Sequence, residues 1–253
     1  MSNALPWFYA PWWFLITTPP VVIGGLVLSS SSRGRAWALR KYTLWAVALF
    51  PVVLVVVMRS TLYDGVRHLL FVYPILAVLA ASGWIAWLST EHRLWERRVA
   101  AGLLALGLVH VLAFNVRSHP NETVYFNELV GGPRGAFARY EMDYWGNCVL
   151  EAVDWSARTA RLSGMALAIS GEPSHVVQLD SERFHELYFT PPNRGQHALD
   201  VRLARGPAEN IIELANRADA LYKVQTADGA VLCVVLPGPA FPTLQSRLSF
   251  PTR

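Results

Sequence analysis

Long uninterrupted apolar stretches fill the first half of the chain, whereas the second half alternates shorter apolar runs with polar ones. Four stretches, near 12–28, 43–58, 69–88 and 99–114, approach the roughly 20 apolar residues that a membrane-crossing helix needs. A soluble helical core would show a polar stripe with a period of 3.6 residues, and no such stripe interrupts these stretches. We therefore expect a membrane α-helical bundle of about four transmembrane helices over residues 1–114.

Residues 115–253 carry the pattern of a small α/β domain, because helix-like segments alternate with short apolar strands. The spacing predicts helices over 122–130, 147–161 and 207–216, with Asn147 as an N-cap and Pro207 at a first helical position. The predicted strands are 165–169, 175–179, 186–189, 198–203, 220–225 and 230–236. Asp228 and Gly229 form a dipeptide that favours a hairpin turn between the last two strands.

Charge is scarce and unevenly distributed. Only 16% of the residues are charged, against roughly 25% in an ordinary soluble domain. Residues 1–114 hold nine Lys or Arg and three Asp or Glu, whereas residues 115–253 hold thirteen and fifteen. The soluble domain is therefore slightly acidic, which argues against a nucleic-acid partner.

The basic residues in the short loops predict the orientation, because cytoplasmic loops are enriched in Lys and Arg. Loop 29–42 holds four basic residues and loop 89–98 holds three, whereas loop 59–68 holds two and the segment before residue 12 holds none. We expect the first two loops to be cytoplasmic. The N-terminus, loop 59–68 and the whole α/β domain are then extracytoplasmic.

The chain has two cysteines, and both fall in this predicted extracytoplasmic domain. An oxidising compartment permits a disulfide between Cys148 and Cys233, while two separately buried thiols are the simpler interpretation. Neither cysteine has a second Cys or His at ligand spacing, so the sequence predicts no metal site. We also expect no cofactor, since no Gly-rich phosphate-binding loop is evident.

The predicted external loop ends in a basic pair, Arg67 and His68, that runs directly into the third span. The planar guanidinium of Arg67 can pair with phosphate oxygens, and His68 can add a donor. These groups at a membrane surface suit a lipid phosphate. Anchoring of Arg67 to the headgroups of any lipid is the alternative.

A second group of residues follows the last span and combines aromatic rings with amide and carboxylate groups. It comprises Asn127, Glu128, Asp143, Tyr144 and Trp145. Rings that stack on sugars, beside groups that bind hydroxyls, would make this an acceptor or sugar contact. Alternatively, the rings pack the domain and Asp143 braces the turn into the next helix. In that interpretation Trp145 is buried, and Gly146 has a backbone conformation that other residues resist.

One histidine, His110, lies near the outward end of the fourth span. A histidine inside a membrane span is a functional candidate, although a position this close to the interface also suits an anchor.

Three segments resemble bacterial polyprenyl-phosphate-dependent glycosyltransferases, members of the C-type superfamily that includes protein O-mannosyltransferases and aminoarabinose transferases. The segments are YAPWW at 9–13 followed by TP at 18–19; RHLLFVYP at 67–74; and the run HP, YFNE, GGP, DYWG, EA and Trp155 between 119 and 155. The resemblance covers most of residues 7–160. Family members usually have a Lys where Thr17 stands here.

This resemblance implies transfer of a sugar from a polyprenyl-phosphate carrier to an extracytoplasmic acceptor, at the bacterial inner membrane. It assigns Arg67, His68 and Tyr73 to the carrier phosphate. The family's catalytic acid lies in an N-terminal half with more spans, and Asp64 is the one carboxylate in loop 59–68. We therefore expect the C-terminal portion of a transferase, inactive without an N-terminal half or partner subunit. The alternative is a non-catalytic, membrane-anchored binding or assembly module.

Overall fold

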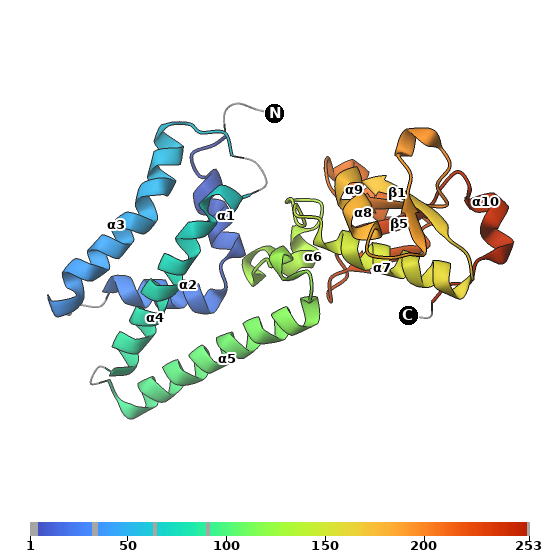
Figure 1. The fold of residues 1–253 in the computed structure, drawn as a ribbon. Coiled ribbons are helices and arrows are strands. Elements are labelled where there is room, and N and C mark those ends of the chain that lie inside the picture. Colours follow the sequence, from blue (N-terminus) through green and yellow to red (C-terminus); the bar gives the residue numbers. More distant parts are fainter. Residues whose placement is uncertain (1–4, 32–34, 63–64, 90–91, 252–253) are drawn as a thin grey trace. The chain divides into compact units, whose positions relative to one another are not determined.

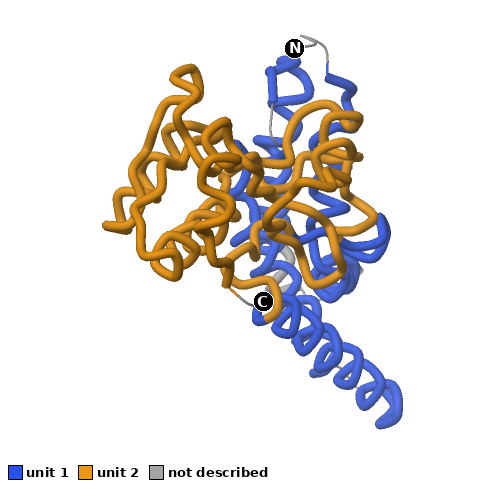
Figure 2. Tube along the Cα trace, turned by 90° about the vertical axis from the view of Figure 1, so that its right-hand side faces the viewer, with its two compact units in different colours: residues 1–116, 125–132 blue, residues 117–124, 133–253 orange. Residues whose placement is uncertain are grey.

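The computed structural model describes residues 5–31, 35–62, 65–89 and 92–251, and the chain divides into two compact units (Figures 1 and 2). The first unit, blue in Figure 2, comprises residues 1–116 and 125–132. The second, orange, comprises residues 117–124 and 133–253. Most contacts of each unit lie within that unit.

The first unit is helical. Its elements are α1 (Tyr9–Thr17), α2 (Pro20–Ser31), α3 (Arg35–Val57), the 3-10 helix η1 (Arg67–Val72), α4 (Tyr73–Ser89), most of α5 (Leu94–Ser118) and the turn η3 (Glu128–Val130). Among the residues that the structure describes, three segments are long and apolar enough to cross a membrane: Leu39–Val57, Arg67–Ser89 and Leu94–Ser118. They coincide with the second, third and fourth predicted stretches, so the chain has the helices of a membrane protein.

The first predicted span is not a single helix. In its place α1 and α2 form a bent pair with an angle of 115° between them. The span predicted over 12–28 is interrupted at Thr17–Pro20 in the sequence, and the structure breaks the helix at that point. The reason is local, because Pro19 and Pro20 lack the N–H groups that would continue the helix. The pair is either a broken span or a re-entrant loop, and the count of spans is three or four accordingly.

Small residues allow α2 and α4 to pack at close range. A Cβ on Gly83 would lie 2.0 Å from the carbonyl oxygen of Gly25 and 2.5 Å from the backbone nitrogen of Ser29. Close backbone approach through Gly and Ser is a recurrent way for helices to associate within membranes. The ring nitrogen of Trp84 adds a hydrogen bond of 2.8 Å to the carbonyl oxygen of Val21, on the same pair of helices.

The second unit is built on a five-stranded mixed sheet with the order β2-β1-β3-β5-β4. The strands are β1 (Leu167–Glu172), β2 (Leu187–Phe189), β3 (Leu199–Leu203), β4 (Tyr222–Gln225) and β5 (Val231–Pro237). β2, β1 and β3 are parallel, whereas β5 runs antiparallel to both β3 and β4. Five of the six predicted strands are present, and the β4–β5 hairpin turns at Asp228 and Gly229 as expected.

Helices complete the second unit. They are α6 (Gly132–Ala136), α7 (Asn147–Leu162), α8 (Ser174–Ser181), α9 (Ala208–Ala215) and α10 (Phe241–Leu244), with the turns η2 (Glu122–Val124), η4 (Pro192–Arg194) and η5 (Gln245–Arg247). α7 packs along β3, β4 and β5. Its predicted apolar face is confirmed, because Val149, Val153, Ala157 and Ala160 are all buried.

Three local predictions in this half of the chain are wrong. Residues 175–179 form part of α8 instead of a strand, because β1 and β2 are parallel neighbours and a parallel connection requires a crossover, usually a helix. The predicted helix over 122–130 is two separate 3-10 turns, η2 and η3. Pro207 is the N-cap of α9, one position before the helix begins.

Candidate functional site

The bend between α1 and α2 leaves backbone carbonyl groups without their helical partners. In a continuous helix the carbonyls of Leu15 and Ile16 would accept from the N–H groups of residues 19 and 20. Both of those residues are prolines and have no N–H to donate. A buried carbonyl without a partner is costly, so the break requires donors from another part of the chain.

Asn127 supplies those donors. Its side-chain nitrogen donates to the carbonyl oxygens of Leu15 at 2.6 Å and Thr18 at 2.9 Å, and its backbone N–H donates to Ile16 at 2.8 Å. Its side-chain oxygen accepts from the backbone N–H of Leu129 at 3.1 Å. The residue is wholly buried. Both amide hydrogens are therefore used in holding the helix break, which leaves them unavailable to a sugar.

Tyr73 joins the same corner from α4. Its hydroxyl lies 2.6 Å from the hydroxyl of Thr17, the last residue of α1, and its ring packs 5.1 Å from that of Phe14. The Thr17 hydroxyl also donates to the carbonyl oxygen of Trp13 at 2.6 Å. Thr17, which stands where the resembling family usually has Lys, therefore links α1 to the start of α4.

The loop before η1 packs against α1. Gly65 has a φ of 69°, and a Cβ there would lie 3.0 Å from the ring of Trp13. That ring in turn packs 5.8 Å from Phe126. Arg67 begins η1, two residues after Gly65, and is half-buried, while His68 is exposed. The carboxylate considered in this loop, Asp64, lies outside the described residues.

An apolar pocket of about 280 Å³ opens beside this corner. Its walls come from α1, α2, α3, η1 and α4, and include Phe14, Leu49, Val72 and Leu76. η1 thus contributes Val72 to the pocket and begins with Arg67, five residues earlier. Arg67 is therefore on the same short helix as a residue of the pocket wall, although it is not itself part of the lining.

Glu128 lies in the same unit and contacts His110 on α5. Nε2 of His110 is 2.6 Å from Oε1 of Glu128, and both side chains are about half exposed. The structure therefore pairs two residues that the sequence analysis treated separately. The sequence could have suggested this pair, because His110 lies near the predicted outward end of the last span and Glu128 follows that end.

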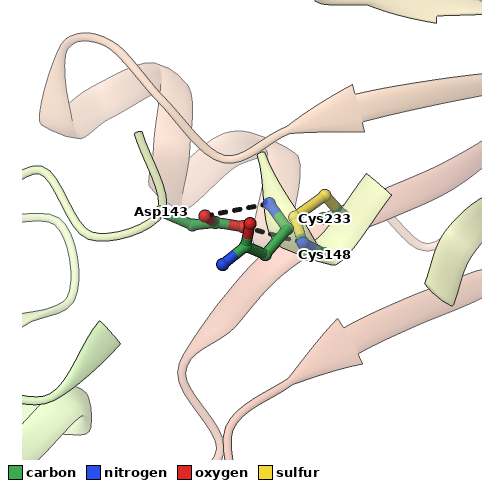
Figure 3. Close-up of a disulfide and its surroundings, with 4 residues drawn as sticks. Asp143, Cys148 and Cys233 are labelled. Atoms are coloured by element: carbon green, nitrogen blue, oxygen red, sulfur yellow. Dashed lines mark hydrogen bonds between the residues drawn. A yellow bond between two sulfur atoms is a disulfide. The ribbon is translucent and has the colours of Figure 1, made fainter. Parts of the chain in front are cut away.

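Asp143, Tyr144 and Trp145 belong to the second unit. Figure 3 shows Asp143 beside the first turn of α7, where its carboxylate oxygens accept from the backbone N–H groups of Asn147 at 3.1 Å and Cys148 at 2.8 Å. Burial raises the pKa of the Asp143 carboxyl, and these backbone donors oppose the rise. The Asp143 side chain therefore satisfies the first N–H groups of α7, whereas the N-cap position, predicted for Asn147, is occupied by Gly146.

The turn that carries these residues is tight but not buried throughout. Gly146 is the N-cap of α7 and has a φ of 71°, as predicted. Trp145 is 53% exposed, so the prediction that it is buried is wrong. Its ring packs 4.9 Å from the neighbouring ring of Tyr144.

Cys148 and Cys233 form a disulfide that joins the first turn of α7 to the middle of β5 (Figure 3). Their Cα atoms are 5.8 Å apart, across 85 positions of sequence. Of the two arrangements that the sequence left open, the structure has the disulfide. The contact is visible only once α7 lies on the sheet.

Two of the residues predicted to contact lipid phosphate or sugar, Tyr73 and Asn127, each bind the end of α1, Tyr73 at Thr17 and Asn127 at Leu15. Arg67 lies six residues before Tyr73, on η1. Across the described residues, no group of three or more His, Cys, Asp or Glu side chains could hold a metal ion. A comparison with family models, curated proteins and solved structures finds no match to this chain.

Proposed function

We propose that this chain binds a polyprenyl-phosphate-linked sugar at the outer face of a bacterial inner membrane, as the carrier-binding part of a glycosyltransferase. The observation that supports it most is the apolar pocket beside η1, whose first residue is Arg67. The prenyl chain would occupy the pocket and the phosphate would pair with Arg67 and His68. The motif resemblance in residues 7–160 supports the same ligand.

In the proposed reaction the bond between the sugar's anomeric carbon and the phosphate oxygen breaks, while an acceptor oxygen bonds to that carbon. The polyprenyl phosphate leaves with an additional negative charge, which Arg67 would stabilise because its guanidinium stays protonated at all physiological pH values. The proposal assigns carrier binding to this chain. The group that deprotonates the acceptor is assigned to an N-terminal half or a partner subunit.

The orientation belongs to the same proposal. If the bent pair α1–α2 crosses the membrane, the chain has four spans and its N-terminus is outside. The hydroxyl of Tyr9, at the start of α1, accepts from the backbone N–H of Gly65 in loop 59–68 at 3.3 Å, so the start of α1 lies on the same side of the membrane as that loop. The α/β domain is extracytoplasmic in this proposal, because it follows α5 and the basic loops 29–42 and 89–98 stay inside.

One finding favours the alternative of a non-catalytic binding or assembly module. Asn127 and Asp143, two of the predicted sugar contacts, are buried and hold backbone groups. A module of this kind would keep both residues for stability and would not need the pocket to bind a carrier.

The pocket itself provides the test. A photoreactive polyprenyl phosphate, added to the full chain in lipid nanodiscs, should label residues that line it. Leu49→Trp fills the pocket and should abolish this labelling, whereas Val53→Trp, an exposed position four residues later on α3 and outside the lining, should leave it intact. Equal labelling of both variants would refute the carrier site and leave the module interpretation.

A further inference from the structure

A second apolar groove lies in the first unit, along α5. Its volume is about 560 Å³, within the range of roughly 300–1,000 Å³ typical of ligand pockets. Its walls come from α2, α4 and α5, with Pro20 and Val21 on the first, Trp84 on the second and Leu106 on the third. Since α5 is a candidate membrane-crossing helix, an apolar groove along it suits a membrane lipid.

Two polar side chains interrupt this apolar lining, and they are the paired residues His110 and Glu128. A carboxylate has two oxygens and can accept about four hydrogen bonds. The contact with His110 at 2.6 Å therefore leaves Glu128 with acceptor capacity for a ligand. The occupant of the groove must combine an apolar chain with a head that donates hydrogen bonds.

This groove differs from the pocket beside η1 in the charge of its polar residue, which is the carboxylate of Glu128 here and the guanidinium of Arg67 on η1. A phosphate would meet the carboxylate of Glu128 and be repelled, since like charges at close range are unfavourable. A hydroxyl, in contrast, donates a hydrogen bond to a carboxylate, and such charge-assisted bonds are among the stronger ones. The two sites therefore suit different lipids, one with a phosphate and one with a hydroxyl.

We infer that the groove between α2, α4 and α5 binds a membrane lipid that carries a hydroxyl in its head, with that hydroxyl on Glu128. Under the proposed function, on which this assignment rests, the lipid is the acceptor of the sugar. The acceptor oxygen then bonds to the anomeric carbon, its proton passes to a base, and polyprenyl phosphate departs.

The test uses the full chain in nanodiscs and two photoreactive probes with identical acyl chains, diacylglycerol and phosphatidic acid. Diacylglycerol should label the groove residues of α5 roughly 10-fold more than phosphatidic acid, in line with one charge-assisted hydrogen bond. Glu128→Ala should remove this preference. Equal labelling by the two probes in the unaltered chain would overturn the inference, because it would mean ordinary surrounding lipid.

Two tryptophan substitutions on α5 make a matched pair. Leu106→Trp fills the groove and should abolish diacylglycerol labelling, whereas Leu108→Trp, which is similarly exposed but outside the lining, should not. Labelling that survives Leu106→Trp would also overturn the inference. Failure of the proposed function has a separate signature, since loss of polyprenyl phosphate labelling at the η1 pocket would leave the diacylglycerol result unchanged.

Discussion

Replacing Asn127 by Ala should destabilise the first unit more than any exposed polar substitution in it. The change removes two donors, to the carbonyls of Leu15 and Thr18, and one acceptor for the N–H of Leu129. Pro19 has no N–H for the carbonyl of Leu15, and the N–H of Val22 donates to Pro19 instead of Thr18, so both carbonyls lose their donor. Each unsatisfied buried group costs about 1–3 kcal/mol, although hydrogen bonds within membranes average nearer 0.6 kcal/mol. We expect a total loss of about 2–4 kcal/mol.

The free energy of unfolding in mixed micelles, titrated with a denaturing detergent, measures this loss. Asn127→Asp should be at least as damaging, because a carboxylate keeps the shape but offers carbonyl oxygens no hydrogen. Asn115→Ala, at an exposed position on α5, is the matched control and should change stability by less than about 0.5 kcal/mol. A loss at Asn127 no larger than this control would refute the account of the α1–α2 break.

Three further predictions concern the α/β domain. Replacing Cys148 and Cys233 by Ser should lower its unfolding free energy by about 2–5 kcal/mol in denaturant titrations, and in intact cells both cysteines should resist alkylation until a reductant is added. Gly146→Val should lower the melting temperature, whereas Gly146→Asn should be tolerated better, because Asn adopts positive φ more readily. Burial lowers the pKa of His197, with Asp200 opposing. Below about pH 6.5, His197 is protonated in the unfolded chain but remains neutral in the folded domain. The free energy of unfolding should therefore fall as the pH drops from 7 toward the lowered pKa of His197. His197→Gln should make the free energy of unfolding depend less on pH over this range.

Much of the fold followed from periodicity, because long apolar runs and alternating strands are local signals. The second to fourth spans, the apolar face of α7 and the β4–β5 hairpin were all predicted in this way. The strand predicted over 175–179 failed because its composition favours β structure locally, while the parallel pairing of β1 with β2 demands a helix.

The candidate site was less predictable, because its contacts join distant segments. The Pro19–Pro20 pair signalled that two carbonyls would need donors, yet no local rule points to Asn127, more than 100 residues away. The capping role of Asp143 was foreseen as an alternative, since it lies only four and five residues from its donors. The large apolar side chain of Trp145 favoured a buried position. Its exposure depends on the backbone conformation of the turn, which the residue type does not predict.

The central proposal is that Arg67 pairs with the phosphate of a polyprenyl carrier. Its most direct test is the equilibrium binding of polyprenyl phosphate to the full chain in nanodiscs made of uncharged lipid. A hydrogen bond to a charged group contributes about 1.5–3 kcal/mol, so Arg67→Ala should weaken binding by roughly 10- to 150-fold. Arg67→Lys should recover only part of the affinity, because an ammonium lacks the planar fork. Arg59→Ala, at an exposed position just after α3, should have little effect. Equal losses at Arg59 and Arg67 would indicate general attraction between basic residues and an anionic lipid, and would contradict the proposal.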